Sequence, residues 1–379
     1  MRILLIGEYS RLHNSLKEAL LLAGHEVTIV GNGDGFKSFP VDLNIDAKFS
    51  KSRIPNVFRQ VVYRVFNYDF ARIEYGIRFK RILPTLKNYD IVQLISETPI
   101  QTSINFEYRL LKQLRAQNKK MVMLCSGTDT IFMQAVADKK FRYSLFDPYL
   151  KDNSTVFEYR QALQSLTPKY KNHYRKMLPL ISGVIATDID YKIAIDGKPE
   201  SLGMIPNPVN IDAISFAPND SSEKIVIFHG INRWNYNKKG NVFFEKAAEI
   251  IKAKYPEKVE VITAENLPYS QYITLYNRAH IVLDQVYAYD QGYNALEAMA
   301  TGKVVFTGAE PEFENYYGLN ERVAINALPD VDAIVDELSA LIENPAEIAA
   351  IGKRARAFIE KEHDYRKIAA KYLGIWSKS

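Results

Sequence analysis

Apolar and polar positions alternate along the chain in a way that predicts short buried strands separated by amphipathic helices. Arg2–Gly7 is a short apolar run that ends in glycine, and Leu12–Ala23 repeats its apolar positions with the period of a helix. The β-branched run Glu26–Val30 follows, so the chain opens as a β-α-β unit. Four further strand-like runs separated by helical stretches predict a parallel sheet covered by helices. They are Ile91–Ile95, Met121–Leu124, Gly183–Ala186 and Gly203–Ile205.

A segment rich in Pro, Asn, Asp and Ser, residues 206–222, interrupts this pattern and is predicted to be a linker. The alternation of strands and helices then restarts, so we expect an α/β protein with two such units. The second unit is predicted from Lys224–Phe228, Asn241–Lys254, Val259–Thr263, Ser270–Arg278, Ile281–Leu283, Tyr293–Thr301 and Val304–Thr307.

Length and composition agree with two domains. The 379 residues exceed the usual size of one domain, and 47% apolar with 25% charged residues exclude a disordered chain. The single Cys125 excludes an intramolecular disulfide, and the six histidines form no Cys/His cluster at metal-ligand spacing. The chain has no run of 18 apolar residues and no signal-peptide pattern, so we expect a cytoplasmic protein.

The net charge of +5 conceals parts of opposite sign. Residues 1–205 hold 30 Lys+Arg against 20 Asp+Glu, residues 206–350 hold 11 against 21, and residues 351–379 hold 8 against 3. This asymmetry indicates that the first half faces an anionic partner, such as a membrane surface, a phosphorylated acceptor or nucleic acid.

Residues 48–90 concentrate this positive charge, with ten basic residues against three acidic ones and aromatic residues interleaved. Such a basic amphipathic segment is typical of contact with anionic lipid headgroups, which would place the protein at the inner face of a membrane. The same pattern also describes core aromatics beside a solvated charged face. No RNA-binding motif accompanies the charge, so nucleic acid is not an expected partner.

The loops after the predicted strands hold the candidate chemistry, because ligands of open α/β sheets bind beyond the carboxyl ends of the strands. Gly7–Ser10 lacks the spacing of a dinucleotide site, which argues against a nicotinamide dehydrogenase. Gln291–Asn294 enters a predicted helix whose backbone N–H groups suit a diphosphate, and Glu297 lies one turn further on, placed to accept hydrogen bonds from ribose hydroxyls. Arg233 and Lys239 flank a polar loop and would neutralise that diphosphate. Taken singly, these features also fit a surface turn and solvated cations.

Four motifs then occur in a fixed order along nearly the whole chain. They are Gly24-His25-Glu26-Val27, Ile205-Pro206-Asn207-Pro208-Val209, Arg233 with Lys239-Gly240, and Leu296-Glu297-Ala298-Met299-Ala300 followed by Gly302. This order resembles that of GT-B glycosyltransferases, and most of all the retaining glycosyltransferase family 4 group.

The resemblance implies two Rossmann-like domains facing across a cleft. Residues 1–205 would bind the acceptor, residues 206–360 would bind the nucleotide sugar, and residues 361–379 would form a helix returning to the first domain, anchored by Trp376. The implied enzyme is a hexosyltransferase-like protein that needs neither metal nor cofactor. It would move a sugar with retention from a nucleotide-sugar donor to a glycan or lipid-linked glycan in surface polysaccharide synthesis.

The implied donor-binding residues include one departure from the family pattern. These residues are Tyr289, Asp290, Gly292, Tyr293, Asn294 and Glu297, with Arg233 and Lys239 stabilising the leaving diphosphate. The family commonly carries Glu, seven residues and then Glu, whereas the position that pairs with Glu297 holds Tyr289 beside Asp290. Three explanations stay open: Asp290 substitutes after a shift of one residue, Tyr289 donates its hydroxyl, or donor activity is lost.

In the first domain, three polar residues after strands are candidates on the acceptor side. Asp129, in Ser126-Gly127-Thr128-Asp129, is the candidate polar group near the reacting centre, and a helix N-cap is the alternative. His13 lies where the family often contacts acceptor or phosphate, and a solvated histidine is its alternative. Glu97, in SETP after another strand, has the same ambiguity.

Two rival functions share this fold or this pattern. A non-hydrolysing nucleotide-sugar epimerase would show a cleft rich in catalytic carboxylates and histidines. A non-catalytic subunit that binds a nucleotide sugar or a glycan is suggested by the missing first Glu.

Overall fold

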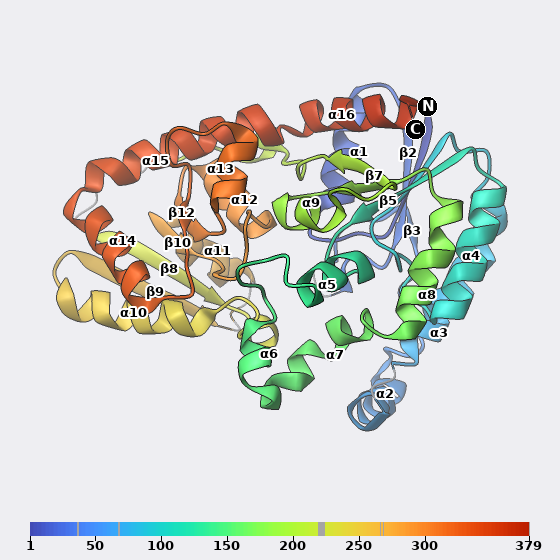
Figure 1. Cartoon of the computed structure of the whole chain (residues 1–379), viewed down its shortest axis with the longest axis horizontal. Helices are drawn as coiled ribbons and strands as arrows, with labels where there is room; N and C mark the ends of the chain where they lie inside the picture. Colours follow the sequence, from blue (N-terminus) through green and yellow to red (C-terminus); the bar gives the residue numbers. More distant parts are fainter. Residues whose placement is uncertain (36–37, 67–68, 219–223, 266, 268, 379) are drawn as a thin grey trace.

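The computed structural model describes residues 1–35, 38–66, 69–218, 224–265, 267 and 269–378. Two α/β units lie side by side, and the C-terminal helices run along one edge of both (Figure 1). The linker joins the last strand of the first unit to the first strand of the second, and its residues 219–222 lie outside the described part of the chain.

The first unit is built on a seven-stranded parallel sheet in the order β3-β2-β1-β4-β5-β6-β7. The order reverses between β1 and β4, so the loops after these two strands diverge and leave room for a ligand. The strands are β1 (Arg2–Ile6), β2 (Glu26–Gly31), β3 (Leu43–Asn44), β4 (Ile91–Leu94), β5 (Lys120–Cys125), β6 (Val184–Ala186) and β7 (Ser201–Met204).

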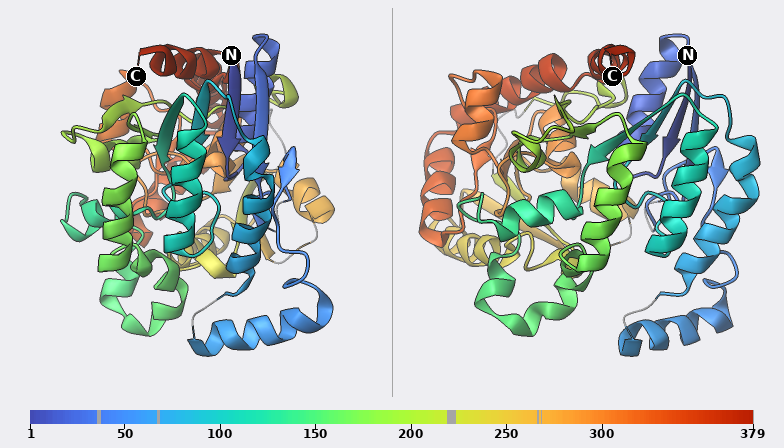
Figure 2. Two further views of the ribbon diagram at one scale, coloured as in Figure 1. Left: turned by 90° about the vertical axis from the view of Figure 1, so that its right-hand side faces the viewer. Right: turned by 45° about the vertical axis from the view of Figure 1, so that its right-hand side comes forward.

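Helices pack around this sheet. They are α1 (Leu12–Leu22), α3 (Ala71–Ile82), α4 (Ile104–Ala116), α5 (Thr130–Ala137), α8 (Pro168–Met177) and α9 (Ile189–Ile195), while α6 (Asp147–Lys151) and α7 (Val156–Gln164) lie beyond the sheet (Figure 1). Helix α2 (Arg53–Phe66) projects away from the rest of the unit (Figure 2). At the end of β1, a Cβ on Gly7 would lie 2.2 Å from Ile95 Cγ2, and its φ of +86° is one that L side chains rarely adopt. The chain therefore needs glycine at this strand end.

The second unit is built on a five-stranded parallel sheet in the order β12-β11-β10-β8-β9, which reverses between β8 and β10. The strands are β8 (Ile225–Ile231), β9 (Val259–Glu265), β10 (Ile281–Leu283), β11 (Val304–Thr307) and β12 (Ile325–Asn326). The helices are α10 (Asn241–Lys254), α11 (Tyr269–Asn277), α12 (Tyr293–Thr301), α13 (Pro311–Tyr317), α14 (Val331–Glu343) and α15 (Pro345–Phe358).

A π-helical turn, Ile359–His363, joins α15 to α16 (Tyr365–Lys378), which crosses back to the first unit and packs on α1. Tyr372 and Trp376 of α16 are buried in one apolar cluster with residues of β1 and α1, among them Leu5 and Leu16. The predicted fold, two Rossmann-like units with a C-terminal helix returning to the first, is therefore confirmed.

Replacing Trp376 with alanine is expected to lower the free energy of unfolding by about 3–5 kcal/mol, because the indole is 1% exposed and its loss leaves a cavity in the core. Urea unfolding followed by circular dichroism measures the change. Lys371→Ala, at an exposed position of the same helix, is the matched control. Equal stabilities of the two variants would contradict the anchoring role.

Candidate active site

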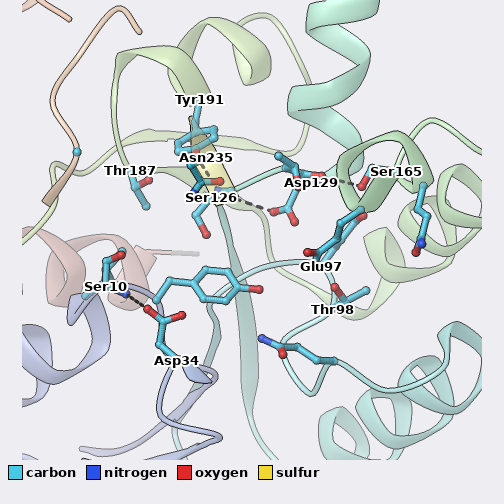
Figure 3. A pocket seen from close by; sticks show the side chains of 18 of the residues that line it. Ser10, Asp34, Glu97, Thr98, Ser126, Asp129, Ser165, Thr187, Tyr191 and Asn235 are labelled. Carbon is cyan, nitrogen blue, oxygen red and sulfur yellow. Dashed lines mark hydrogen bonds between the residues drawn. The ribbon is translucent and has the colours of Figure 1, made fainter. Parts of the chain in front are cut away.

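A cavity of about 720 Å³ lies between the two units, at the carboxyl ends of the first sheet (Figure 3). The segments that follow β1, β4, β5 and β6 form about half of its wall, and helices α2, α3, α7 and α8 contribute further residues. The second unit contributes Asn235, Gly292 and Tyr293. The cavity therefore opens where the reversal of strand order predicts a ligand site, and it faces the first turn of α12.

The first turn of α12 meets the loop after β8 at a buried carboxylate. Lys239 Nζ and Asn294 Nδ2 each lie 2.8 Å from Asp284 Oδ1. Gly240 holds this loop close to the loop after β10, since a Cβ there would lie 2.8 Å from Val286 Cβ. The structure thus brings together two of the predicted donor-site residues, Lys239 and Asn294, and places the helix N-terminus beside them.

Two other predicted donor residues lie apart from this contact. Arg233 is half exposed, and its guanidinium donates to both carboxylate oxygens of Glu265 while stacking on Tyr236. Glu297 is partly buried on α12, one turn beyond Gly292. Arg233, Lys239 and Glu297 are all absent from the cavity wall, whereas Gly292 and Tyr293 belong to it.

Tyr289, predicted to contact the donor sugar, instead belongs to the contact between the two units. Its side chain is 2% exposed, and its hydroxyl accepts a hydrogen bond from the Arg142 backbone N–H at 2.6 Å. The ring packs against Phe141 and Tyr143, while the Arg142 guanidinium lies 4.8 Å from its centroid. Its hydroxyl therefore does not face the cavity.

The side chain of Asp290 also takes part in this contact between the units. Its Oδ2 accepts from the Ile189 backbone N–H at 3.0 Å, at the N-terminus of α9. In return, Asp190 Oδ2 accepts from the backbone N–H groups of Tyr289 and Asp290 at 3.0 and 3.2 Å. The stretch that carries a donor-binding Glu in the resembling family here ties the second unit to α9 of the first.

Three carboxyl groups meet at this contact. Burial raises the pKa of Asp190 to about 7 and of Asp290 to about 6. The pKa of Asp188 is also raised, by burial and then by the charges of Asp190 and Asp290. These groups therefore hold protons at a pH where exposed aspartates are ionised.

Glu97 and Asp129 lie together on the wall of the cavity, at the ends of β4 and β5. Glu97 Oε1 accepts from the backbone N–H and the hydroxyl of Thr130, so Glu97 caps α5 from the neighbouring strand. Asp129 stands at the N-cap position of α5 but makes no capping hydrogen bond. Burial raises the pKa of Glu97 to about 7, and burial and the Glu97 charge raise that of Asp129.

His13 does not reach the cavity, contrary to the prediction of an acceptor contact. It is fully buried, and its two ring nitrogens lie 2.7 Å from the Gly7 carbonyl and 3.2 Å from the Gln93 side-chain amide. Burial lowers its pKa to about 4, so the ring is neutral at physiological pH. It supports the chain at the end of β1.

Sequence reasoning missed several residues of the cavity wall. Asp188 and Tyr191 follow β6, and inspecting every predicted strand end would have found them. Gln161 and Gln164 come from α7, which no strand precedes. Helix α7 also bridges the cleft, because Glu158 accepts from the Asn237 side-chain amide at 2.8 Å and from the Lys238 backbone N–H at 3.2 Å.

Two comparisons with known proteins bear on different parts of the chain: a family model matches the second unit, and solved structures match the fold of the whole chain. Residues 228–374 match the family described as "Glycosyl transferase-like". No curated protein matches the chain. The solved structures include HepE from Anabaena with UDP and glucose, at 13% identity, TM-score 0.62 and full coverage of both chains. They also include sucrose-phosphate synthase from Thermosynechococcus elongatus, at 13% identity, TM-score 0.60, and coverage of 100% of this chain and 99% of that chain.

A third similar structure belongs to one of the rival functions. UDP-GlcNAc 2-epimerase from Neisseria meningitidis, bound to UDP-GlcNAc, matches over all of both chains at 12% identity with a TM-score of 0.53. These likenesses show that the chain has the GT-B fold, which transferases and epimerases share.

The contact between the units generates a prediction for pH dependence. The raised pKa values of Asp190 and Asp290 mean that the native state binds protons that the unfolded state, with aspartate pKa values of about 3.9, has lost. The stability that these two groups contribute should therefore be fully present below about pH 4 and be lost as pH rises through 6 to 7. Asp190→Asn, which keeps an acceptor for both N–H groups, should reduce this fall by on the order of 2 kcal/mol.

Urea unfolding at pH 4.5 and 7.5 measures this difference, with Asp336→Asn, at an exposed position of α14, as the control. A pH dependence identical in wild type and Asp190→Asn would contradict the interpretation.

Proposed function

We propose that this protein is a glycosyltransferase that moves a sugar from a nucleotide-sugar donor to a glycan hydroxyl. One observation carries the proposal: Gly292 and Tyr293, at the start of α12, line the same polar cavity as Glu97 and Asp129, and Lys239 and Asn294 meet at Asp284 beside this helix turn. A helix N-terminus beside a lysine suits a diphosphate, and the facing carboxyl groups suit sugar hydroxyls. The glycosyl transferase-like match covers this donor side, and UDP is bound in the HepE structure.

We propose transfer with retention, in which the bond between the sugar anomeric carbon and the diphosphate oxygen breaks while a bond to the acceptor oxygen forms on the same face. The acceptor proton passes to the leaving diphosphate. Lys239 and the N–H groups of Tyr293 and Asn294 stabilise its developing charge. Arg233 would join them by exchanging Glu265 for phosphate. Asp129 and Glu97 orient the incoming hydroxyl.

The rival functions predict different products from the same donor. We expected an epimerase to show both carboxyl groups and histidines in its cleft. In the described part of the chain, carboxyl groups line the cavity but no histidine does. Asp290 accepts a hydrogen bond from the start of α9 and so is not directed at a donor sugar, which agrees with a non-catalytic binding subunit. Proton NMR of a UDP-sugar incubated with the protein distinguishes them, because epimerisation yields a 2-epimer, transfer needs an acceptor, and a binding subunit changes nothing.

Lys239→Ala is expected to abolish the thermal stabilisation by UDP and to lower kcat/KM for the donor by about 10²-fold, because one cation at the leaving group is lost. Glu297→Ala should weaken UDP binding through the ribose. Lys252→Ala, at an exposed position of α10, is the control. Assays contain EDTA, because the proposal gives a metal no role.

No nucleotide response in the wild-type protein would overturn the donor site. A requirement for Mg²⁺ or Mn²⁺ would overturn only the metal-independent mechanism.

We further propose that the enzyme works at the surface of an anionic membrane, on a lipid-linked acceptor for a surface polysaccharide. Helix α2 has no acidic residue and presents Val57, Phe58, Val61 and Val65 to solvent, each more than half exposed. Their spacing of three and four residues forms one apolar stripe. No described helix is long and apolar enough to cross a bilayer.

Two further features support this orientation. Arg53 and Arg64 are exposed on α2, where each could gain about 1 kcal/mol from an anionic surface. Tyr63 of the same helix lines the cavity, so a membrane touching α2 would lie at the cavity mouth.

Vesicles of phosphatidylcholine with 30% phosphatidylglycerol should sediment the protein, and pure phosphatidylcholine vesicles should not. Arg53→Gln with Arg64→Gln should weaken binding at least fivefold, and Val61→Asp should abolish it. Ile250→Asp, at an exposed apolar position of the second unit, is the control. Equal binding by Val61→Asp and Ile250→Asp would contradict docking through α2.

A further inference from the structure

The wall of the cavity concentrates carboxyl groups at three neighbouring strand ends. Glu97 follows β4, Asp129 follows β5 and Asp188 follows β6, and these strands are adjacent in the sheet. All three charges act on one buried thiol, because burial and then Asp129, Asp188 and Glu97 raise the pKa of Cys125 at the end of β5. Figure 3 shows Glu97 and Asp129 directed into the same space. The three groups therefore form one acidic surface.

Neutral groups supply the hydrogen bonds to these carboxylates. Glu97 accepts from Thr130, Asp129 from the Ser126 backbone N–H at 3.4 Å, and Asp188 from the Tyr191 backbone N–H at 3.0 Å. Within the described ranges, no lysine, arginine or histidine forms an ion pair with any of the three. No basic side chain in the described part of the chain therefore pairs with these three carboxyl groups.

One oxygen of this surface has no hydrogen bond within the described residues. Glu97 is 1% exposed, and its Oε2 is buried without a partner, an arrangement that costs free energy unless a ligand supplies a donor. Among the described residues, the cation on the cavity wall is Arg72, and it makes no hydrogen bond to Glu97. Its guanidinium donates to the Gln101 and Thr102 carbonyls at 3.2 and 3.0 Å and to the Tyr170 hydroxyl at 3.3 Å.

Aromatic rings complete the wall. Tyr9, Tyr170, Tyr191 and Tyr293 line the cavity together with the carboxyl groups. Carboxylates beside tyrosine rings suit an organic ammonium group, which gains ion pairs from the former and cation–π attraction from the latter. A phosphate or carboxylate group placed against these three carboxyl groups would gain no ion pair from them.

We propose that the acceptor carries a primary amine, as an amino sugar does, and that Glu97, Asp129 and Asp188 bind its ammonium group. The inference rests on the proposed function, because it names the acceptor class for the same cleft. An ammonium group has three N–H donors, which match three carboxyl acceptors. A neighbouring hydroxyl of the same sugar stays neutral and serves as the nucleophile.

The raised pKa values of Glu97 and Asp129 give this assignment a measurable consequence. Burial raises the pKa of Glu97 to about 7 and raises that of Asp129 further, because the two charges repel. Without a cation these groups retain protons near neutral pH. Binding of an ammonium group would lower both pKa values, so the protein should release protons when the acceptor binds.

Isothermal titration of the whole protein with glucosamine, glucose, N-acetylglucosamine and glucuronate tests the proposal. Glucosamine should bind at least tenfold more tightly than glucose or N-acetylglucosamine, and glucuronate should not bind. Repeating the glucosamine titration in phosphate and in Tris, which differ in ionisation enthalpy, should reveal proton release. N-acetylglucosamine is the key comparison, because it keeps the ring and removes the charge.

Asp129→Asn and Glu97→Gln, which preserve shape, should each reduce the preference for glucosamine by at least fivefold, whereas exposed Asp336→Asn should not. Unchanged melting temperatures show that the variants fold. Equal binding of glucosamine and N-acetylglucosamine by wild type would overturn the inference, as would an undiminished preference in both variants.

UDP binding, measured separately, keeps the two proposals distinguishable. UDP binding without an amine preference would refute the acceptor class and leave the donor site standing. An amine preference without any nucleotide binding would support the cation site and refute the glycosyltransferase.

Discussion

The rest of the site depends on hydrogen bonds that the side chains of Asp190 and Asp290 accept across the contact between the units. Asp190 accepts from the backbone N–H groups of Tyr289 and Asp290, and Asp290 accepts from that of Ile189, so the start of α9 and the loop before α12 hold one another in place. Tyr289 extends this contact through Arg142, whose guanidinium pairs with Glu310 and Glu312. The cavity exists because this contact fixes the first turn of α12 opposite the carboxyl ends of the first sheet.

The first unit carries basic and acidic side chains on two different surfaces. The basic residues of α2 lie on a helix that projects into solvent, while the cavity wall holds carboxyl groups and tyrosines. The expectation that the positive half faces an anionic partner stays a prediction, and our proposal assigns it to α2, outside the cleft. Summed charge says nothing about which face of a sheet or helix the charges occupy, and only the fold separates them.

Some site residues were predictable because their position follows from local sequence. Asp129, Glu97 and Gly292 directly follow strands or begin a helix, and parallel sheets bring all such ends to one edge. The convergence of Lys239 and Asn294 was expected from the order of motifs and occurs at Asp284. His13 satisfied the same positional rule, yet its ring turns into the core, because burial of a side chain depends on packing that the rule does not describe.

The sequence by itself determined the two α/β units, a helical C-terminus and the strand ends that carry polar groups, because hydrophobic periodicity and turn residues act over a few positions. The return of the C-terminal helix to the first unit was implied by the family resemblance and not by local pattern. Only the tertiary structure decided the roles of Tyr289 and Asp290, whose partners lie about 100 or more positions away along the chain. It also decided that Glu97 and not Asp129 caps α5, and that α7 reaches across the cleft. Such contacts depend on how the two sheets are placed relative to one another, which no local pattern encodes.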